Sequence, residues 1–106
     1  MRHPNIINFV GACKRDTHTG ATEYFVLMEL CEGGSLMDKL TRQNGTPLPE
    51  KEVCKAFEKI CLGVRVLHSQ NPPIAHRDLK IENVLIGANG DYKLCDFGSC
   101  TTRAQA

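Results

Sequence analysis

The sequence HRDLKIENVLIGANGDYKLCDFG, residues 76–98, places Asp78 and Asn83 before a short apolar hairpin and Asp96 directly after it, so these three oxygen-bearing side chains are expected to converge. Mg²⁺ is bound in proteins by a few carboxylate or carbonyl oxygens together with phosphate oxygens and water, which makes Asn83 and Asp96 candidate metal ligands. Asp78 is placed to face an incoming hydroxyl group, and Lys80 would add positive charge near a transferring phosphoryl group. These residues supply what phosphoryl transfer requires: a proton acceptor, metal ligands and positive charge.

A short β-hairpin would bring these residues together. The apolar segments 84–86 and 92–95 flank the sequence GANGD, whose Asn89 and Gly90 tolerate the positive φ angles of a tight turn. Both ends of a hairpin lie at one edge, so residues 76–83 and 96–98 are expected to lie close together.

Two strands and a short helix are expected before this region. Residues 7–13 and 23–30 are rich in β-branched and aromatic side chains and are predicted to form an antiparallel pair. Gly33 and Gly34 then interrupt the strand pattern, and Ser35 is placed to cap a short helix that runs to about Arg42.

A longer helix is predicted over residues 50–69, where apolar residues recur at helical spacing and two prolines follow. Gly63 in its middle costs about 1 kcal/mol relative to alanine, so it indicates close packing. The apolar positions are Val53, Phe57, Ile60, Val64 and Leu67.

Composition indicates a globular chain and favours neither nucleic acid nor an anionic membrane as partner. The 106 residues are 42% hydrophobic and carry a formal net charge of +1, from 13 basic and 12 acidic residues. No segment approaches the roughly 18 apolar residues of a membrane span, and the N-terminal apolar run is too short for a signal peptide. We expect an intracellular protein. The cysteines form no CxxC pair and favour neither a zinc site nor a disulfide framework.

HRDLKIEN followed by DFG resembles the catalytic loop and the metal-binding motif of eukaryotic protein kinases. The resemblance implies that Asp78 is the catalytic base, that Lys80 assists at the γ-phosphate of ATP, and that Asn83 and Asp96 hold Mg²⁺. Lysine at position 80 is similar to serine/threonine kinases rather than tyrosine kinases. ATP, Mg²⁺ and a protein with serine or threonine hydroxyls are therefore the expected cofactors and partners.

The same resemblance implies an α+β, protein-kinase-like fold and its central part. Residues 1–31 would be the end of the small lobe, with its fourth and fifth strands and the hinge. Residues 32–106 would be the large lobe from helices D and E through the catalytic-loop hairpin to DFG.

Further residues acquire implied roles around the nucleotide. Met28 is similar to the gatekeeper, and the backbone of the hinge would face adenine. Leu85 would form the floor beneath the base, Ser35 lies where many kinases contact ribose, and Cys95 directly precedes Asp96 at the back of the site. The hinge residues are Glu29, Leu30 and Cys31.

Three apolar or aromatic side chains resemble the stacked spine of an active kinase, and Arg77 would pair with a phosphorylated activation loop. The spine residues are His76, Phe97 and Phe9.

Within the kinases, LMELCEGGSLMDKL, NPPIAHRDLKIENVLI and KLCDFGSCTT are most similar to the Numb-associated kinases, which include adaptor-associated, cyclin-G-associated and fungal actin-regulating kinases. The sequence departs from that family at Ala75 and Cys100, away from the chemistry. Membership implies threonine-directed phosphorylation of endocytic adaptor proteins. It also implies a cytoplasmic location, with membrane-peripheral placement at endocytic sites.

The resemblance covers only the middle of a kinase domain, which has consequences for the isolated polypeptide. A Gly-rich loop and the strand lysine that grips the phosphates do not occur in these 106 residues, so alone they are expected to be inactive. Val53, Phe57, Ile60 and the edges of both hairpins should lack partners, which favours marginal folding or aggregation. The alternatives are a catalytically inactive kinase-like module that binds partners or nucleotide, and a truncated regulatory product.

Overall fold

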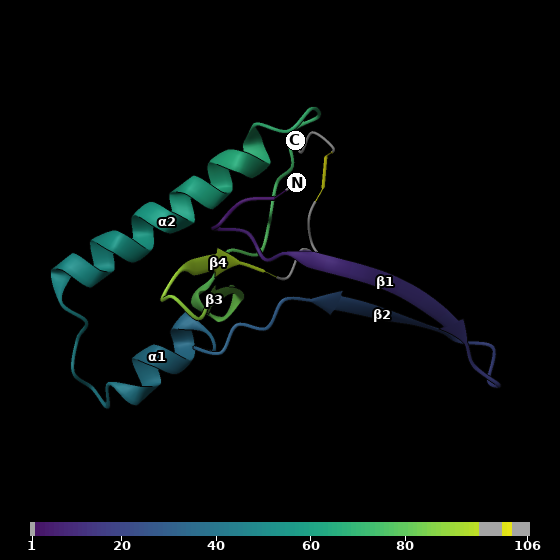
Figure 1. The fold of residues 1–106 in the computed structure, drawn as a ribbon, viewed down its shortest axis with the longest axis horizontal. Coiled ribbons are helices and arrows are strands. Elements are labelled where there is room, and N and C mark those ends of the chain that lie inside the picture. Colours follow the sequence, from purple (N-terminus) through teal and green to yellow (C-terminus); the bar gives the residue numbers. More distant parts are fainter. Residues whose placement is uncertain (1, 96–100, 103–106) are drawn as a thin grey trace.

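The computed structural model describes residues 2–95 and 101–102. In Figure 1 a long two-stranded ribbon, β1–β2, extends to one side of a body that contains the helices and the short β3–β4 hairpin. The elements in chain order are β1 (Phe9–Asp16), β2 (Thr22–Met28), α1 (Leu36–Arg42), α2 (Glu50–His68), the 3₁₀ turn η1 (Ile81–Asn83), β3 (Val84–Ile86) and β4 (Tyr92–Leu94).

The β1–β2 ribbon confirms the predicted antiparallel pair. Its register runs from Phe9 opposite Met28 to Asp16 opposite Thr22, with an irregularity between Phe9 and Gly11. Every residue of both strands is exposed. The two strands are therefore held together by their backbone ladder and by exposed cross-strand contacts such as the Arg15–Glu23 ion pair.

The predicted bounds of this pair were displaced: the first strand begins at Phe9 and continues to Asp16 rather than ending at Cys13, and the second begins at Thr22. Ile7, expected in the first strand, is buried, and its N–H donates to the carbonyl of Leu94 at 2.9 Å. The N–H of Leu94 donates in turn to the carbonyl of Asn5 at 2.9 Å, so this segment runs parallel to β4. The second strand ends at Met28 rather than Leu30. A local apolar pattern cannot tell which distant strand a residue will join.

The β3–β4 hairpin matches the prediction closely. Val84 lies opposite Leu94 and Ile86 opposite Tyr92. Gly90 adopts a φ of 78° in the turn, where the N–H of Gly87 donates to the carbonyl of Asp91 at 2.8 Å. The side chains that alternate onto one face are buried, which anchors the hairpin in the body.

Helix α2 packs against β4, and Gly63 marks the contact. A Cβ atom at this position would lie 2.8 Å from the carbonyl oxygen of Asn5 and 2.9 Å from Cδ1 of Leu94. The predicted close packing is confirmed. Val53 and Phe57 are exposed, as expected, whereas Ile60 is half-buried and packs against the core.

Helix α1 begins at a capping box that includes the predicted Ser35. The Ser35 Oγ accepts a hydrogen bond from the N–H of Asp38 at 3.1 Å, and Asp38 Oδ2 accepts one from the N–H of Ser35 at 2.9 Å. These bonds favour the carboxylate and lower the pKa of Asp38.

Just before this helix, the connecting segment is tied to β3 by a pair of backbone hydrogen bonds. Gly33 N–H donates to the carbonyl of Ile86 at 2.9 Å, and Ile86 N–H donates to the carbonyl of Gly34 at 2.8 Å. A Cβ atom on Gly33 would lie 2.7 Å from Cβ of Ile86, so a larger residue would push the two segments apart.

The core lies between α1, α2 and the β3–β4 hairpin. Tyr92 is fully buried at its centre, and its hydroxyl is satisfied by Lys39 Nζ at 3.1 Å and Glu52 Oε2 at 3.5 Å. The bond to this hydroxyl raises the pKa of Lys39. The buried cluster consists of Ile6, Leu36, Ala56, Leu67, Val84, Ile86, Tyr92 and Leu94. No helix in the part of the chain that the structure describes combines the length and apolar character needed to span a bilayer.

Candidate active site

The loop before β3 is anchored by His76, which is buried. Its Nδ1 accepts the N–H of Asp78 at 3.2 Å, so Nε2 carries the proton and donates to the carbonyl of Cys95 at 2.9 Å. One side chain thereby fixes the start of the loop to the end of β4. Arg77, the residue between His76 and Asp78, adopts a φ of 69°, a conformation that few non-glycine residues use. Its side chain is exposed.

The structure brings Asp78, Lys80 and Asn83 together. Asn83 Nδ2 donates to the backbone carbonyl of Asp78 at 2.9 Å and to its Oδ2 at 3.1 Å. Lys80 Nζ lies 3.6 Å from Asp78 Oδ1. Asn83 is buried, Asp78 is half-buried and Lys80 is exposed. The three side chains therefore lie at the protein surface, with Asn83 the most deeply placed.

The η1 turn and β4 place Asn83 beside the segment that follows β4. The N–H of Cys95 donates to the carbonyl of Asn83 at 3.0 Å. Cys95 is buried. The predicted metal ligand Asp96 is the next residue, and it lies outside the described residues, as do Phe97 and Cys100.

The donor set that the structure describes fits the ligand chemistry of Mg²⁺. Both hydrogen bonds from the Asn83 side chain use its amide nitrogen, whereas a metal ion would use the amide oxygen. The hydrogen bonds to Asp78 leave the amide oxygen of Asn83 without a role in them, and its part as a metal ligand together with Asp96 stays a prediction. Within residues 2–95 and 101–102, no group of three acidic, histidine or cysteine side chains converges on one point.

Most residues predicted to surround the nucleotide lie in the segment from the end of β2 to the start of α1, and Leu85 lies in β3. Ser35 and Leu85 form an isolated antiparallel bridge, so the predicted ribose contact and the predicted floor are neighbours. Met28 ends β2, and Leu30 is largely exposed. Burial raises the pKa of the Cys31 thiol, the Glu29 carboxylate raises it further, and Lys93 opposes both. These assignments remain predictions.

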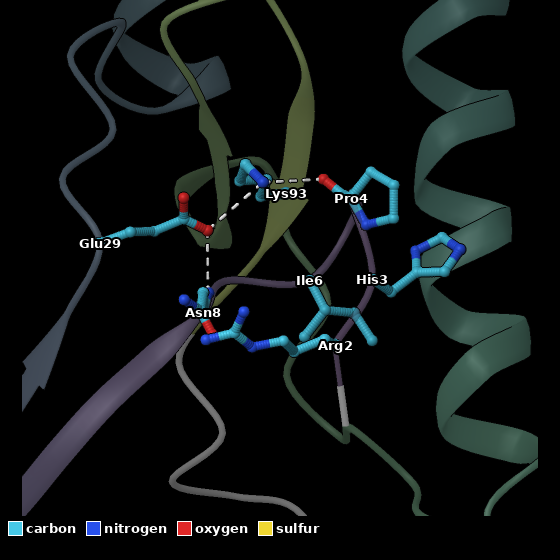
Figure 2. A pocket seen from close by; sticks show the side chains of 7 residues that line it. All are labelled: Arg2, His3, Pro4, Ile6, Asn8, Glu29 and Lys93. Atoms are coloured by element: carbon cyan, nitrogen blue, oxygen red, sulfur yellow. Dashed lines mark hydrogen bonds and ion pairs between the residues drawn. The ribbon is translucent and has the colours of Figure 1, made fainter.

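The side chain of Glu29 lies in a pocket of about 310 Å³, shown in Figure 2. Its Oε1 accepts the N–H of Asn8 at 2.9 Å and forms an ion pair with Lys93 Nζ at 3.3 Å. Lys93 Nζ also donates to the carbonyl of Pro4 at 3.0 Å. The Glu29 carboxylate thus binds groups on β4 and on the segment before β1.

Sequence reasoning missed this pair because it joins residues far apart in the chain. Lys93 interrupts a short apolar strand and is only 14% exposed, so a lysine within YKLC was the available signal for a buried charged partner. Asn5 was missed for the same reason: it is buried, and its Nδ2 donates to the carbonyl of Tyr92 at 2.9 Å.

Comparison with known proteins identifies the class to which this fold and this loop belong. The sequence matches the protein kinase domain family over residues 1–106, and the chain belongs to that family. Its α+β arrangement is the expected protein-kinase-like fold.

Particular relatives are named serine/threonine kinases or actin-regulating kinases. The chain is 47% identical over 104 residues to a probable serine/threonine-protein kinase of Dictyostelium discoideum, covering 95% of this chain and 13% of that protein. It is 49% identical over 88 residues to actin-regulating kinase 1 of Saccharomyces cerevisiae, covering 83% of this chain and 14% of that protein. A serine/threonine-protein kinase of Schizosaccharomyces pombe is 41% identical over 98 residues, with 92% and 10% covered. The chain thus spans a small part of each relative's length.

Proposed function

We propose that this chain is the catalytic-loop region of a serine/threonine protein kinase that transfers the γ-phosphate of ATP to a protein hydroxyl. One observation carries the proposal: Asn83 is within 3.1 Å of the Asp78 carboxylate, and Lys80 approaches the other carboxylate oxygen at 3.6 Å. Residues 1–31 then serve as the end of the small lobe and the hinge, and residues 32–106 as the start of the large lobe.

In this reaction the hydroxyl oxygen of serine or threonine forms a new bond to the γ-phosphorus, and the bond from that phosphorus to the bridging oxygen breaks. ADP leaves with the bonding electrons, and the hydroxyl proton passes to Asp78. The Asn83 bond to Asp78 Oδ2 orients the carboxylate, which leaves the hydroxyl to approach the less constrained oxygen.

Lys80 contributes positive charge at the same position. Its ammonium group is half-exposed and lies near Asp78 Oδ1, so it can move between the carboxylate and an incoming phosphate oxygen. When bound, Mg²⁺ neutralises charge on the phosphates, and Asn83 and Asp96 are the residues that would hold it.

The finer assignment is membership of the Numb-associated kinases. It is supported by the motifs around LMELCEGGSL and by the likeness to actin-regulating kinase 1 of Saccharomyces cerevisiae. From this we propose threonine in endocytic adaptor proteins as the substrate, and cytoplasmic action at endocytic membranes.

The test is a hybrid kinase, in which the full 106-residue chain replaces the matching segment of actin-regulating kinase 1. The hybrid should phosphorylate threonine peptides with ATP and Mg²⁺. Asp78→Asn should lower kcat by about 10²–10⁴-fold, the usual contribution of a positioned general base. Asp96→Asn and Asn83→Ala should raise the Mg²⁺ concentration needed for half-maximal rate.

Glu82→Gln is the matched control, because Glu82 is an exposed carboxylate within the same η1 turn. It should leave kcat unchanged. A hybrid that binds nucleotide but transfers no phosphate would overturn the proposal in favour of a kinase-like binding module.

A further inference from the structure

We propose that Glu29 and Lys93 are positioning residues for the nucleotide: their ion pair holds the hinge segment 29–31 against the β3–β4 hairpin and so sets the affinity for ATP. The inference rests on the proposed function and adds a determinant that lies outside the predicted catalytic set. Figure 2 shows the pocket in which dashed lines join Glu29, Lys93, Asn8 and Pro4.

The contacts tie three parts of the chain to one carboxylate. Glu29 Oε1 accepts the N–H of Asn8 at 2.9 Å and lies 3.3 Å from Lys93 Nζ. Lys93 Nζ donates to the carbonyl of Pro4 at 3.0 Å. The backbone N–H of Glu29 also donates to the carbonyl of Asn8 at 2.9 Å. Both the side chain and the backbone of Glu29 are thus fixed.

The two partners lie on the elements that would enclose a nucleotide. Lys93 is opposite Leu85 in the β3–β4 register, and β3 directly follows Asn83. Glu29 directly precedes Leu30 and Cys31, whose backbone is predicted to face adenine. The ion pair therefore fixes the distance between the predicted hinge and the hairpin that carries the predicted floor and metal ligand.

Burial makes this ion pair more consequential than an ordinary surface pair. The Lys93 side chain is 14% exposed and that of Glu29 31%. Removal of either partner would leave the other charge partly buried and unpaired, which favours movement of the segment toward water. The Arg15–Glu23 pair of the ribbon, with side chains 67% and 45% exposed, has no such consequence.

The pocket around Glu29 is occupied by an internal ion pair. Lys93 is the lining residue that pairs with the Glu29 carboxylate, so the charges of both residues are already matched within the pocket. The ion pair holds separate segments of the chain together, and its loss should therefore change the affinity of the neighbouring nucleotide site for ATP.

The experiment measures nucleotide and peptide kinetics in the hybrid kinase. Lys93→Met and Glu29→Gln should each raise KM for ATP by about 5- to 20-fold, at the lower end of typical coupling between sites. The kcat value and KM for the peptide should change less than about twofold. Lys93→Arg, which keeps the charge, should restore most of the ATP affinity. The double variant should be no worse than either single variant, because both remove one interaction.

Arg15→Met and Glu23→Gln are matched controls, since they break the exposed ion pair and should not change KM for ATP. An unchanged KM for ATP in both Lys93→Met and Glu29→Gln would overturn the inference. So would an equal rise in KM for the peptide, which would indicate general loosening of the fold, or a rise in activity.

Binding of a fluorescent ATP analogue to the Asp78→Asn hybrid separates this inference from the proposed function. If that hybrid binds the analogue and Lys93→Met weakens binding by about 5-fold or more, the inference holds even if phosphate transfer fails. If binding is unaffected by Lys93→Met, the inference fails whatever the catalytic result. A thermal melt of each variant confirms that the comparison is made between folded proteins.

Discussion

The β1–β2 ribbon and the body around the β3–β4 hairpin are both built on antiparallel pairs of apolar strands, yet they differ in burial. All residues of the ribbon strands are exposed, including Phe25, Val26 and Leu27. In the short hairpin, Val84, Ile86, Tyr92 and Leu94 are buried against helix α2 and the segment before β1. Figure 1 shows the ribbon extending away from that body.

The difference shows that apolar strand sequence and burial are separate properties. A two-stranded ribbon can pair without burial but is at best marginally stable alone, and burial requires a third element on one face of the strands. The predicted catalytic residues belong to the body, where packing can hold them within hydrogen-bonding distance. At the base of the ribbon, the Glu29 carboxylate joins Asn8, which precedes β1, to Lys93 of β4.

A substitution in the buried hairpin tests whether the body provides most of the stability of the chain. Leu94→Ala removes a side chain that is buried between α2 and the first segment, and should cost about 2–5 kcal/mol of unfolding free energy. Val26→Ala, in the exposed ribbon, should cost no more than about 1 kcal/mol. Urea unfolding of the 106-residue chain, followed by circular dichroism, measures both. Equal losses of unfolding free energy in the two variants would contradict the conclusion that the body is packed and the ribbon is not.

Two glycine substitutions test the same difference in packing between the body and the ribbon. Gly63→Val would force a branched side chain against the Asn5 carbonyl and Leu94, and overpacking of this kind costs about 1–3 kcal/mol. Gly11→Val should be neutral or slightly stabilising, because a Cβ atom there meets nothing within 4 Å and valine favours strands. Melting temperatures of the two variants provide the measurement. A stable Gly63→Val variant would mean that α2 does not pack against β4 as described.

The smallest effect concerns the cap of α1, at the edge of the body. Ser35→Ala should cost about 1 kcal/mol at neutral pH, the usual value for an N-cap hydroxyl. Because the folded pKa of Asp38 is lowered, the carboxylate stabilises the fold above the ordinary aspartate pKa near 4, and this contribution disappears as the pH falls through the lower folded value.

The difference between Ser35→Ala and the unmodified chain should therefore shrink below about pH 4. Asp38→Asn is the matched variant, and it should remove this part of the pH dependence. Unfolding curves at neutral and acidic pH test the point, and a difference that grows in acid would refute the assignment.

Local features of the fold could be predicted from sequence because their causes are local. The GANGD turn, the cap at Ser35 and the helical apolar spacing each depend on a few neighbouring residues. Asp78 and Asn83 are five residues apart in the loop before that hairpin and are hydrogen-bonded to each other, whereas the predicted convergence with Asp96 concerns a residue outside the described ones.

Features that depend on distant partners could not be predicted in this way. Helical periodicity indicated Val53 and Phe57 along with Leu67, but only tertiary packing decides that Leu67 is buried and the first two exposed. The parallel pairing of Ile6 with Leu94 and the Glu29–Lys93 ion pair join opposite ends of the chain. No local pattern records such contacts.

The bonds that tie Gly33 and Gly34 to β3 have a mechanical consequence. Glu29 is fastened to β4 through Lys93, and Gly33 to Ile86, so only residues 30–32 connect the two anchors. The four Cα–Cα steps from Glu29 to Gly33 span at most about 14 Å when fully extended. A rotation of the ribbon relative to the body would therefore have to be taken up on the β2 side within these few residues, and it would displace the far end of the ribbon more than its base.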